Sequence, residues 1–335
     1  MKAASRTKTV LLLTSVLTLA LGVASLLCGS VDIPADQVWA ALFGDGASKT
    51  TWQNIIVELR LPMAVTAALG GMALAVAGLL MQTAFDNPLA GPSIMGVSSG
   101  ASLGVAVVVM LLGSSAAGAL GGALAGAAAV IAILVALSSV VRSTLMLLIV
   151  GILVGYLTSS VISLLNYFAT REMLQAFVLW GLGTFGDVAR EDLGVFSAVC
   201  LLFTSAAFLM IKPLNAMLLG DRYAESMGVS VRRSRTLLLV IAGALTAAVT
   251  AWCGPIAFIG LVVPHVARMA VNTSDHTRLL PATALAGAFT GELTLWLSVL
   301  PWGEGSIPVN AITPVLGVPV ILYIIIFRRK LNYFN

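Results

Sequence analysis

Three ionisable side chains lie within apolar stretches of the sequence, where they could carry proton chemistry. His265 and Arg268 are three residues apart and would share one face of a helix over residues 256–271. Glu292 is the one carboxylate well inside an apolar run. Ionisable groups inside a membrane segment can form a proton relay. The alternative is structural: an anchor facing the cytoplasmic side for His265 and Arg268, and a hydrogen-bonded partner for Glu292. We favour the structural interpretation for both.

No other cluster has the spacing of a catalytic or metal centre. His265 and His276 are the only histidines, and neither has a cysteine or carboxylate at ligand spacing. An odd number of cysteines in apolar segments indicates buried thiols rather than a disulfide framework; they are Cys28, Cys200 and Cys253. No lysine ends a G-x-x-x-x-G-K-[ST] loop, so the chain has no P-loop. We therefore expect no catalytic residues, no metal, no cofactor and no ATP hydrolysis by this route.

Composition places these residues in a membrane protein. Of 335 residues, 59% are hydrophobic and 10% charged, whereas a soluble domain carries about 25% charged residues. Long apolar runs without period-two alternation exclude a transmembrane barrel. The net charge of +4 comes from basic residues at the ends of apolar runs, so we expect no nucleic-acid partner. The sequence predicts an all-α polytopic membrane protein that lies in a lipid bilayer.

The apolar runs predict ten membrane-spanning helices, each near the length that a bilayer requires. They cover residues 10–27, 61–82, 94–112, 116–140, 144–166, 193–211, 236–252, 256–271, 279–300 and 311–327. We interpret the first as an uncleaved span rather than a signal peptide, because Leu27 before Cys28 does not fit a lipoprotein cleavage site. Residues 31–60 are expected to form an outside loop with an interfacial helix, and residues 171–192 to face water around an amphipathic segment.

The basic residues set the orientation. With the N-terminus inside, Lys49, Arg60, Arg171 and Arg190 are the ones left outside, so 14 of the 18 Lys and Arg residues (18 − 4) face the cytoplasm. Both termini are then cytoplasmic.

Small residues recur at the spacing of helix–helix contacts. They are Gly100 with Gly104, Gly118 with Gly122 and Gly126, Gly151 with Gly155, and Gly287 with Gly291. Such spacing permits close backbone approach between helices in lipid. Gly91-Pro92 and Gly254-Pro255 open spans on opposite faces, which suggests an inverted repeat of spans two to five and seven to ten.

A polar island interrupts this apolar sequence at residues 213–235. It reads PLNAMLLGDRYAESMGVSVRRSR, and Gly220 and Gly228 each end a short helical pattern. Two short cytoplasmic helices between two spans would form a docking site for a partner. The alternative is a solvated loop that only connects the spans.

Several phrases resemble the iron-chelate and vitamin B12 uptake permeases of ATP-binding-cassette (ABC) importers, the FecCD type. They include residues 59–62 (LRLP), 87–92 (NPLAGP), 96–101 (GVSSGA) and 254–268 (GPIAFIGLVVPHVAR). The resemblance covers essentially the whole chain and implies one permease domain over residues 1–335, with coupling helices at about 213–230. It also implies a dimer of ten-span subunits in the inner membrane, two cytoplasmic ATPase subunits and a periplasmic substrate-binding protein.

The resemblance also implies roles for individual residues. The cytoplasmic gate would contain Asn87, Leu89 and, by a looser alignment, Thr144. Arg60 would dock the binding protein. The residues that contact the ATPase would be Leu218, Gly220, Arg222, Ala224, Glu225 and Gly228. This sequence departs from the family pattern at Met63 and Trp296, where arginines are common, and at Asn310, where glycine is usual. Docking would therefore rest more on Arg60 or on different contacts, and Asn310 would change the polarity of the substrate side.

The sequence thus favours the permease subunit of an importer for a metal chelate such as a ferric siderophore, haem or cobalamin. An importer of an oxyanion such as molybdate is the nearest alternative. An ion-coupled secondary transporter would need charges at the bilayer midplane, where Glu292 alone gives thin support. A membrane enzyme would need a convergent cluster of His, Asp or Ser residues, which the sequence lacks.

Overall fold

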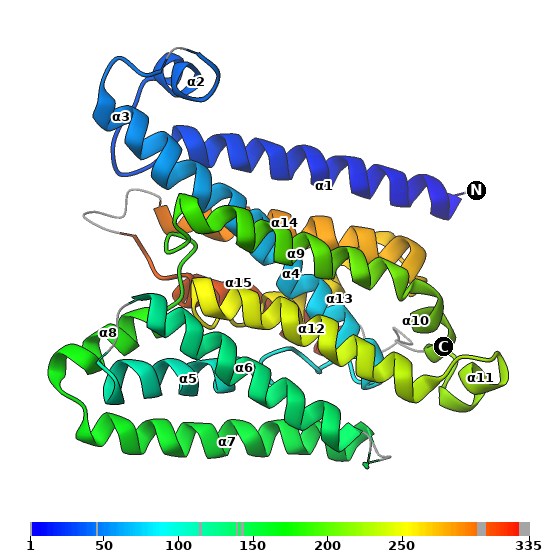
Figure 1. Ribbon diagram of the computed structural model, residues 1–335. Helices are drawn as coiled ribbons and strands as arrows, with labels where there is room; N and C mark the ends of the chain where they lie inside the picture. The colour runs from blue at the N-terminus through cyan, green and yellow to red at the C-terminus, as the bar shows by residue number, and fades with distance from the viewer. Residues whose placement is uncertain are drawn as a thin grey trace.

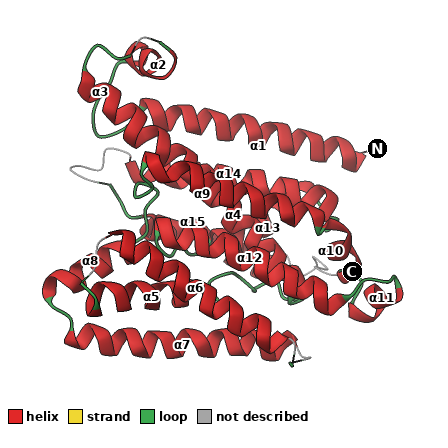
Figure 2. Ribbon diagram, viewed as in Figure 1, coloured by secondary structure: helices red, strands yellow, loops and turns green. Residues whose placement is uncertain are grey.

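The computed structural model describes residues 2–44, 46–113, 116–138, 140–141, 144–299 and 306–327. In these ranges the chain forms helices joined by loops, without a strand (Figure 2). The prediction of an all-α fold is confirmed. Arg142 and the basic residues 328–330, which entered the charge argument, lie outside the described residues.

Long helices account for most of the chain. They are α1 (Lys2–Leu27), α4 (Leu61–Ala84), α5 (Val97–Leu111), α6 (Ala116–Ser138), α7 (Thr144–Phe168), α9 (Arg190–Leu209), α12 (Val231–Cys253), α13 (Ile259–Val271), α14 (His276–Val299) and α15 (Val309–Phe327). The short elements are α2 (Ala35–Phe43), α3 (Thr50–Asn54), the π-helix η1 (Ile55–Arg60), α8 (Arg171–Gly181), α10 (Ile211–Met217) and α11 (Asp221–Ser226).

Each predicted span coincides with one of the long helices, but the number of membrane crossings stays a prediction. Six helices in the described part of the chain are long and apolar enough to cross a bilayer, and three more apolar helices are shorter: Val97–Leu111, Ile259–Val271 and Val309–Ile324. The helix predicted to start at residue 61 extends outward to Thr50, because a π-helical turn carries it past Pro62. The inverted repeat and the single-domain division also stay predictions.

The two ends of the bundle differ. The start of α1 lies at the same end as α10 and α11, and α2, α3 and α8 lie at the opposite end (Figure 1). We call these the inner and outer ends. Helix α2 is viewed almost along its axis in Figure 1, whereas α1 runs across the picture. An amphipathic helix with this orientation, with Val38 buried and Phe43 exposed, fits the predicted interfacial helix.

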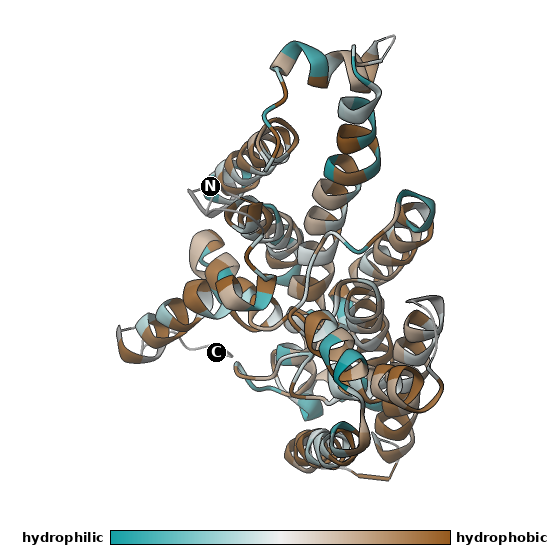
Figure 3. Cartoon of the chain, turned by 90° about the vertical axis from the view of Figure 1, so that its left-hand side faces the viewer, coloured by the Kyte–Doolittle hydropathy of each residue, from teal (hydrophilic) through white to brown (hydrophobic). Residues whose placement is uncertain are grey.

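The periphery of the bundle is apolar. Large hydrophobic side chains on α1, α7 and α9 are more than half exposed, for example Leu12 at 69%, Leu157 at 65% and Leu202 at 65%. Figure 3 shows hydrophobic segments on the outer helices as well as at the centre. Exposed apolar surface of this extent is expected where lipid, not water, surrounds the protein.

Helix α4 is the centre of the fold and packs against α14, α12, α13 and α9. Its backbone comes close to two neighbours through glycine. A Cβ atom on Gly71 would overlap the carbonyl oxygen of Gly287 in α14, and one on Gly78 would overlap that of Gly260 in α13. The predicted contact glycines on α5 and α6 behave alike, since Gly104 lies against Gly122. Backbone approach of this kind lets dispersion contacts hold lipid-embedded helices together.

We expect Gly78→Ala to destabilise the protein, because the added methyl group must separate α4 from α13. Overpacking of this kind costs about 1–3 kcal/mol. The control is Gly194→Ala on α9, where a Cβ would meet open space and alanine is the better helix former. Thermal unfolding of the purified variants should show a lower midpoint for Gly78→Ala only. Equal midpoints for the two variants would contradict the close contact.

Candidate functional site

The turn that follows α4 at the inner end projects one apolar side chain. Asp86 takes a left-handed conformation (φ 48°), and the Asn87 side chain accepts a hydrogen bond from the backbone N–H of Leu89 at 2.9 Å. Leu89 is 49% exposed, whereas Ala90 directly after it is fully buried. Residues 85–92, which we call the gate turn, therefore form a compact loop with Leu89 at its tip.

His265 holds this turn from α13. Its Nε2 lies 2.8 Å from the carbonyl oxygen of Pro88, and the imidazole is 3% exposed. Gln82 in the last turn of α4 donates to the carbonyl oxygen of Leu261 at 3.1 Å. His265 thus contacts the chain's own backbone, which matches the structural interpretation of this residue rather than a proton relay.

Glu292 is also engaged within the fold. It is 3% exposed on α14 and accepts a hydrogen bond from the Ser25 hydroxyl of α1 at 3.3 Å. A Cβ on Gly22 would come within 3.5 Å of its carboxylate, so α1 passes directly over it. This contact between two helices fits the structural interpretation.

The polar island forms two short helices, α10 and α11, as the sequence predicts. Gly220 and Gly228 bracket α11 with positive φ angles of 94° and 81°, which glycine adopts without strain. Arg222 and Glu225 are exposed on α11, and Leu218 before it is half-buried. Ala224 is 0% exposed and packs into the bundle. The side of α11 that carries Ala224 faces inward, and the contact of Ala224 with a partner stays a prediction.

The outward side of this region carries large apolar side chains that the sequence reasoning missed. Leu219, Tyr223 and Met227 are 62%, 51% and 59% exposed. Tyr223 lies within α11 and Met227 directly follows its last residue, whereas Leu219 precedes Gly220, the N-cap of the helix. Large apolar residues at every fourth position within a polar island were the feature of the sequence that could have indicated this exposed surface.

Thr144 is the first residue of α7, and its side chain lies outside the described residues.

Arg60 is buried at the outer end, which conflicts with a docking role. It is 7% exposed, and its guanidinium donates to the carbonyl oxygens of Leu26 (2.8 Å), Leu27 (3.1 Å) and Val31 (2.5 Å). Two of these carbonyls end α1 and would otherwise lack partners. A binding protein could reach this charge only if it left its present acceptors.

Asn310, like Arg60, uses its side chain to bind backbone groups of other segments at the outer end. Its side chain accepts from the N–H of Ala257 at 3.1 Å and donates to the carbonyl oxygens of Gly181 (3.2 Å) and Pro255 (2.5 Å). The amide therefore joins the start of α15 to the loops after α8 and before α13. The amide is used internally, so its predicted effect on the polarity of the substrate side is not the role that this geometry supports.

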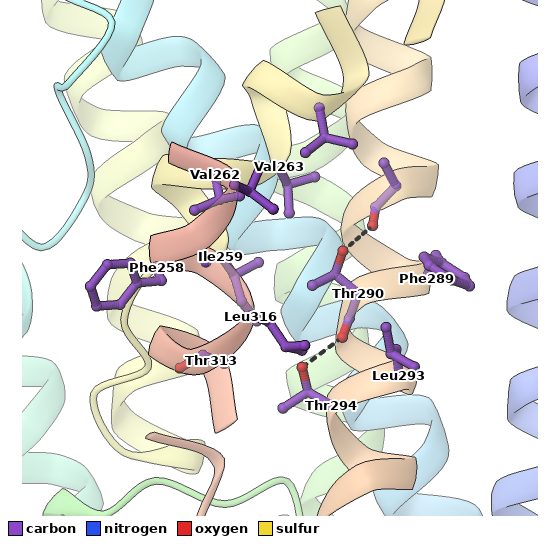
Figure 4. Close-up of a pocket in the computed structure, with 14 residues that line it drawn as sticks. Phe258, Ile259, Val262, Val263, Phe289, Thr290, Leu293, Thr294, Thr313 and Leu316 are labelled. Carbon is purple, nitrogen blue, oxygen red and sulfur yellow. Dashed lines mark hydrogen bonds between the residues drawn. The ribbon is translucent and has the colours of Figure 1, made fainter. Parts of the chain in front are cut away.

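An apolar cavity of about 280 Å³ lies between α13, α14 and α15 (Figure 4). Phe258, Val262 and Leu316 line it, together with Thr290 and Thr294, whose hydroxyls donate to carbonyls of their own helix at 2.8 Å each. The side chains around this cavity carry no charge. Its lining includes no His, Cys, Asp or Glu that could bind a metal, and the described residues hold no cluster of three or more metal-ligating side chains.

A helical bundle with an apolar periphery, in which six of the described helices are long and apolar enough to cross a bilayer, is typical of a multi-pass membrane protein. A model of the FecCD transport family matches residues 17–327. The chain is 35% identical over 321 residues to the hemin transport system permease protein of Yersinia pestis, covering 93% of each chain. The chain therefore belongs to the FecCD transport family.

Other relatives agree. Identity is 34% over 313 residues to the vitamin B12 import system permease protein of Citrobacter koseri, covering 92% of this chain and 94% of that one. It is 33% over 319 residues to the ferric enterobactin transport system permease protein of Escherichia coli, covering 92% of each. A solved structure of a metal-chelate type ABC transporter in an inward-facing conformation superimposes with a TM-score of 0.85 at 29% identity, covering 96% of this chain and 99% of that one.

We expect Arg60→Met to destabilise the fold, because the carbonyl groups of Leu26, Leu27 and Val31 would lose their buried donor. Each buried unsatisfied group costs about 1–3 kcal/mol. The control is Arg190→Gln, which removes an exposed ion pair with Glu58 (2.6 Å) at the same end, a contact worth about 0–1 kcal/mol. The thermal midpoint should fall clearly for Arg60→Met and little for Arg190→Gln. An unchanged midpoint for Arg60→Met would show that the guanidinium is free for docking.

Proposed function

We infer that the chain is the membrane-spanning permease subunit of an ABC importer that takes up a metal chelate, such as a ferric siderophore, haem or cobalamin. The observation that carries this inference is similarity over more than nine-tenths of the chain to permeases named for hemin, vitamin B12 and ferric enterobactin. As a permease of this family it is a multi-pass protein of the inner membrane with ATPase and binding-protein partners.

The finer assembly is part of this proposal. Two copies of the chain, each with ten spans and cytoplasmic termini, would surround one pathway. Two separate ATPase subunits would hydrolyse ATP beneath it, in agreement with the missing P-loop. A periplasmic binding protein would dock on the outer end, where the burial of Arg60 favours contacts through other residues.

The inner end of the bundle would carry both the contact with the ATPase and the gate of the pathway. Leu219, Tyr223 and Met227 expose apolar side chains around α11, the residue types that interface cores use, and the exposed Arg222 and Glu225 on α11 would supply a polar rim. We propose that this surface enters the ATPase. Asn87 and Leu89 of the two copies would meet across the dimer axis and close the pathway, with Thr144 beside them.

Uptake into proteoliposomes tests this function. They would contain the permease with the ATPase and binding protein from its own transport system, and would be offered haemin, cyanocobalamin, ferric enterobactin or molybdate. We expect uptake of a metal chelate that requires ATP, and no ATP hydrolysis by the permease alone. Uptake of molybdate alone would favour the oxyanion importer. Uptake driven by an ion gradient without the ATPase would refute the ABC mechanism.

We expect Tyr223→Ala with Met227→Ser to weaken ATPase binding, because these side chains supply exposed apolar area at the proposed interface. Loss of two anchors at the centre of an interface costs about 2 kcal/mol or more each, so affinity should fall at least about a hundredfold. The spans should be unaffected. The control is Leu209→Ala, an 83% exposed side chain on α9 away from α11. Co-purification of the ATPase and its titration against the permease in nanodiscs would measure the effect. Unchanged affinity of the double variant for the ATPase would indicate that α11 only connects the spans.

A further inference from the structure

Two chains of hydrogen bonds run from the short inner helices to the last two residues of α4. One begins on α11 and ends at Ala84, and the other begins on α10 and ends at Thr83. The gate turn starts directly afterwards. The two short helices are therefore joined to adjacent residues of α4, one through the Ala84 carbonyl and one through the Thr83 hydroxyl.

The first path passes through Arg235 at the start of α12. Its Nη2 donates to both carboxylate oxygens of Asp221, at 3.1 and 3.0 Å, and its Nε donates to the carbonyl oxygen of Ala84 at 2.9 Å. The Arg235 side chain is 15% exposed, so water and salt screen its charge little. Hydrogen bonds from a charged donor are about twice as strong as neutral ones.

The second path passes through His276 at the start of α14. Its Nδ1 lies 3.0 Å from the Asn215 side-chain oxygen on α10, and its Nε2 lies 3.0 Å from the Thr83 hydroxyl. The backbone N–H of His276 also donates to Asn215 at 2.8 Å, and the Asn215 amide donates to Asp275 at 2.8 Å. His276 is 0% exposed, so each of these contacts is made within the protein.

The joined segment is well placed to control the gate turn. Phe85 after Ala84 is 5% exposed and anchors the start of the turn, and Asp86 follows in its left-handed conformation. Burial raises the pKa of the Asp86 carboxyl, and the nearby negative charge of Asp221 raises it further, which places α11 close to the turn itself. The far side of the turn is held by His265.

We propose that Arg235 and His276 are positioning residues that make the inner end of α4 follow α11 and α10 when the ATPase moves them. This inference rests on the proposed function. Asp221 is half exposed beside the proposed ATPase face, so docking would exclude water from it and strengthen its bond to Arg235. A displacement of α11 would then pull on the Ala84 carbonyl and change the position of Leu89.

The test follows the gate turn directly and needs no transported substrate. Leu89→Cys would carry a nitroxide label in a background with the three native cysteines replaced by alanine. Distances between the two labels of the dimer would be measured by pulsed EPR in the full complex with its ATPase, without nucleotide and with ATP and vanadate. The path variants are Arg235→Met, Asp221→Asn and, for the second path, Asn215→Ala. The control is Arg233→Met, which removes an exposed positive charge from the same helix.

We expect the parent and Arg233→Met to change label distance with nucleotide. In Arg235→Met and Asp221→Asn, the ratio of the two distance populations should shift about tenfold toward the nucleotide-free state, the size of effect that one lost charge-assisted hydrogen bond gives. Asn215→Ala should reduce the change to a smaller extent, because its path is made of neutral groups. Arg235→Met combined with Asp221→Asn should be no worse than either alone, since they interrupt one path. Asp221→Glu should restore the change, and ATP hydrolysis should persist in every variant.

Three results would overturn the proposal or its basis. Parent-like distances in Arg235→Met and Asp221→Asn, in complexes that hydrolyse ATP, would refute the inference alone. A lower thermal midpoint with an unchanged distance distribution would show that these contacts only stabilise the fold. A parent complex that forms but shows no nucleotide-dependent distance would instead refute the proposed gate, and the inference would fail with it. If the complex with Arg235→Met does not assemble, Asp221→Asn provides the test, because the side chain of Asp221 is half exposed and its substitution should not prevent assembly.

Discussion

The contact on which the rest of the structure depends is the direct backbone approach of α4 to α13 and α14. Gly78 meets Gly260 on one side, and Gly71 meets Gly287 on the other, with no space for a methyl group at either place. Lipid supplies no hydrophobic force to drive helices together, so close packing and polar contacts must hold them. Two helices, α13 and α14, are thereby fixed against the central helix α4. The peripheral helices, such as α1 and α7, leave large apolar side chains exposed, as expected for a surface in lipid.

Because the middle of α4 is packed closely against its neighbours, we expect movement mainly at the ends of the helices. There, charged and polar side chains bind the backbone of neighbouring segments. Arg6 donates to the carbonyl oxygens of Ala270 (2.7 Å) and Met269 (3.1 Å), which ties the inner end of α1 to the last turn of α13. Arg60 at the end of η1 donates to the carbonyl oxygen of Leu26, which joins the outer end of α1 to the start of α4. At the inner end of α4, Arg235 and His265 contact backbone carbonyls on the two sides of the gate turn. Each of these arginine and histidine side chains contacts a backbone carbonyl at the end of a helix or in the turn that follows it.

The sequence predicted the helices, the polar island and the family, because apolar run length and a long specific phrase determine them locally. It did not predict which face of a short helix turns inward, so it gave no sign that the Ala224 side chain is buried. Arg60 was expected at a surface, since a charge at the end of a span gives no sign that it will cap a distant helix. Gly71, Gly78 and Gly260 were missed because their partners lie far away in the chain. The spacing of Leu219, Tyr223 and Met227 was readable in advance.

We infer that α4 stays rigid as far as Gln82 while the gate turn after its inner end moves. Hydrogen–deuterium exchange of the complete transporter in nanodiscs, with and without ATP and vanadate, would detect this difference. We expect the amides of residues 65–82 to stay protected and unchanged in both states, and peptides covering residues 85–92 to change their exchange with nucleotide. Exchange that changes along the whole of α4, or a gate turn that does not respond to nucleotide, would contradict this inference.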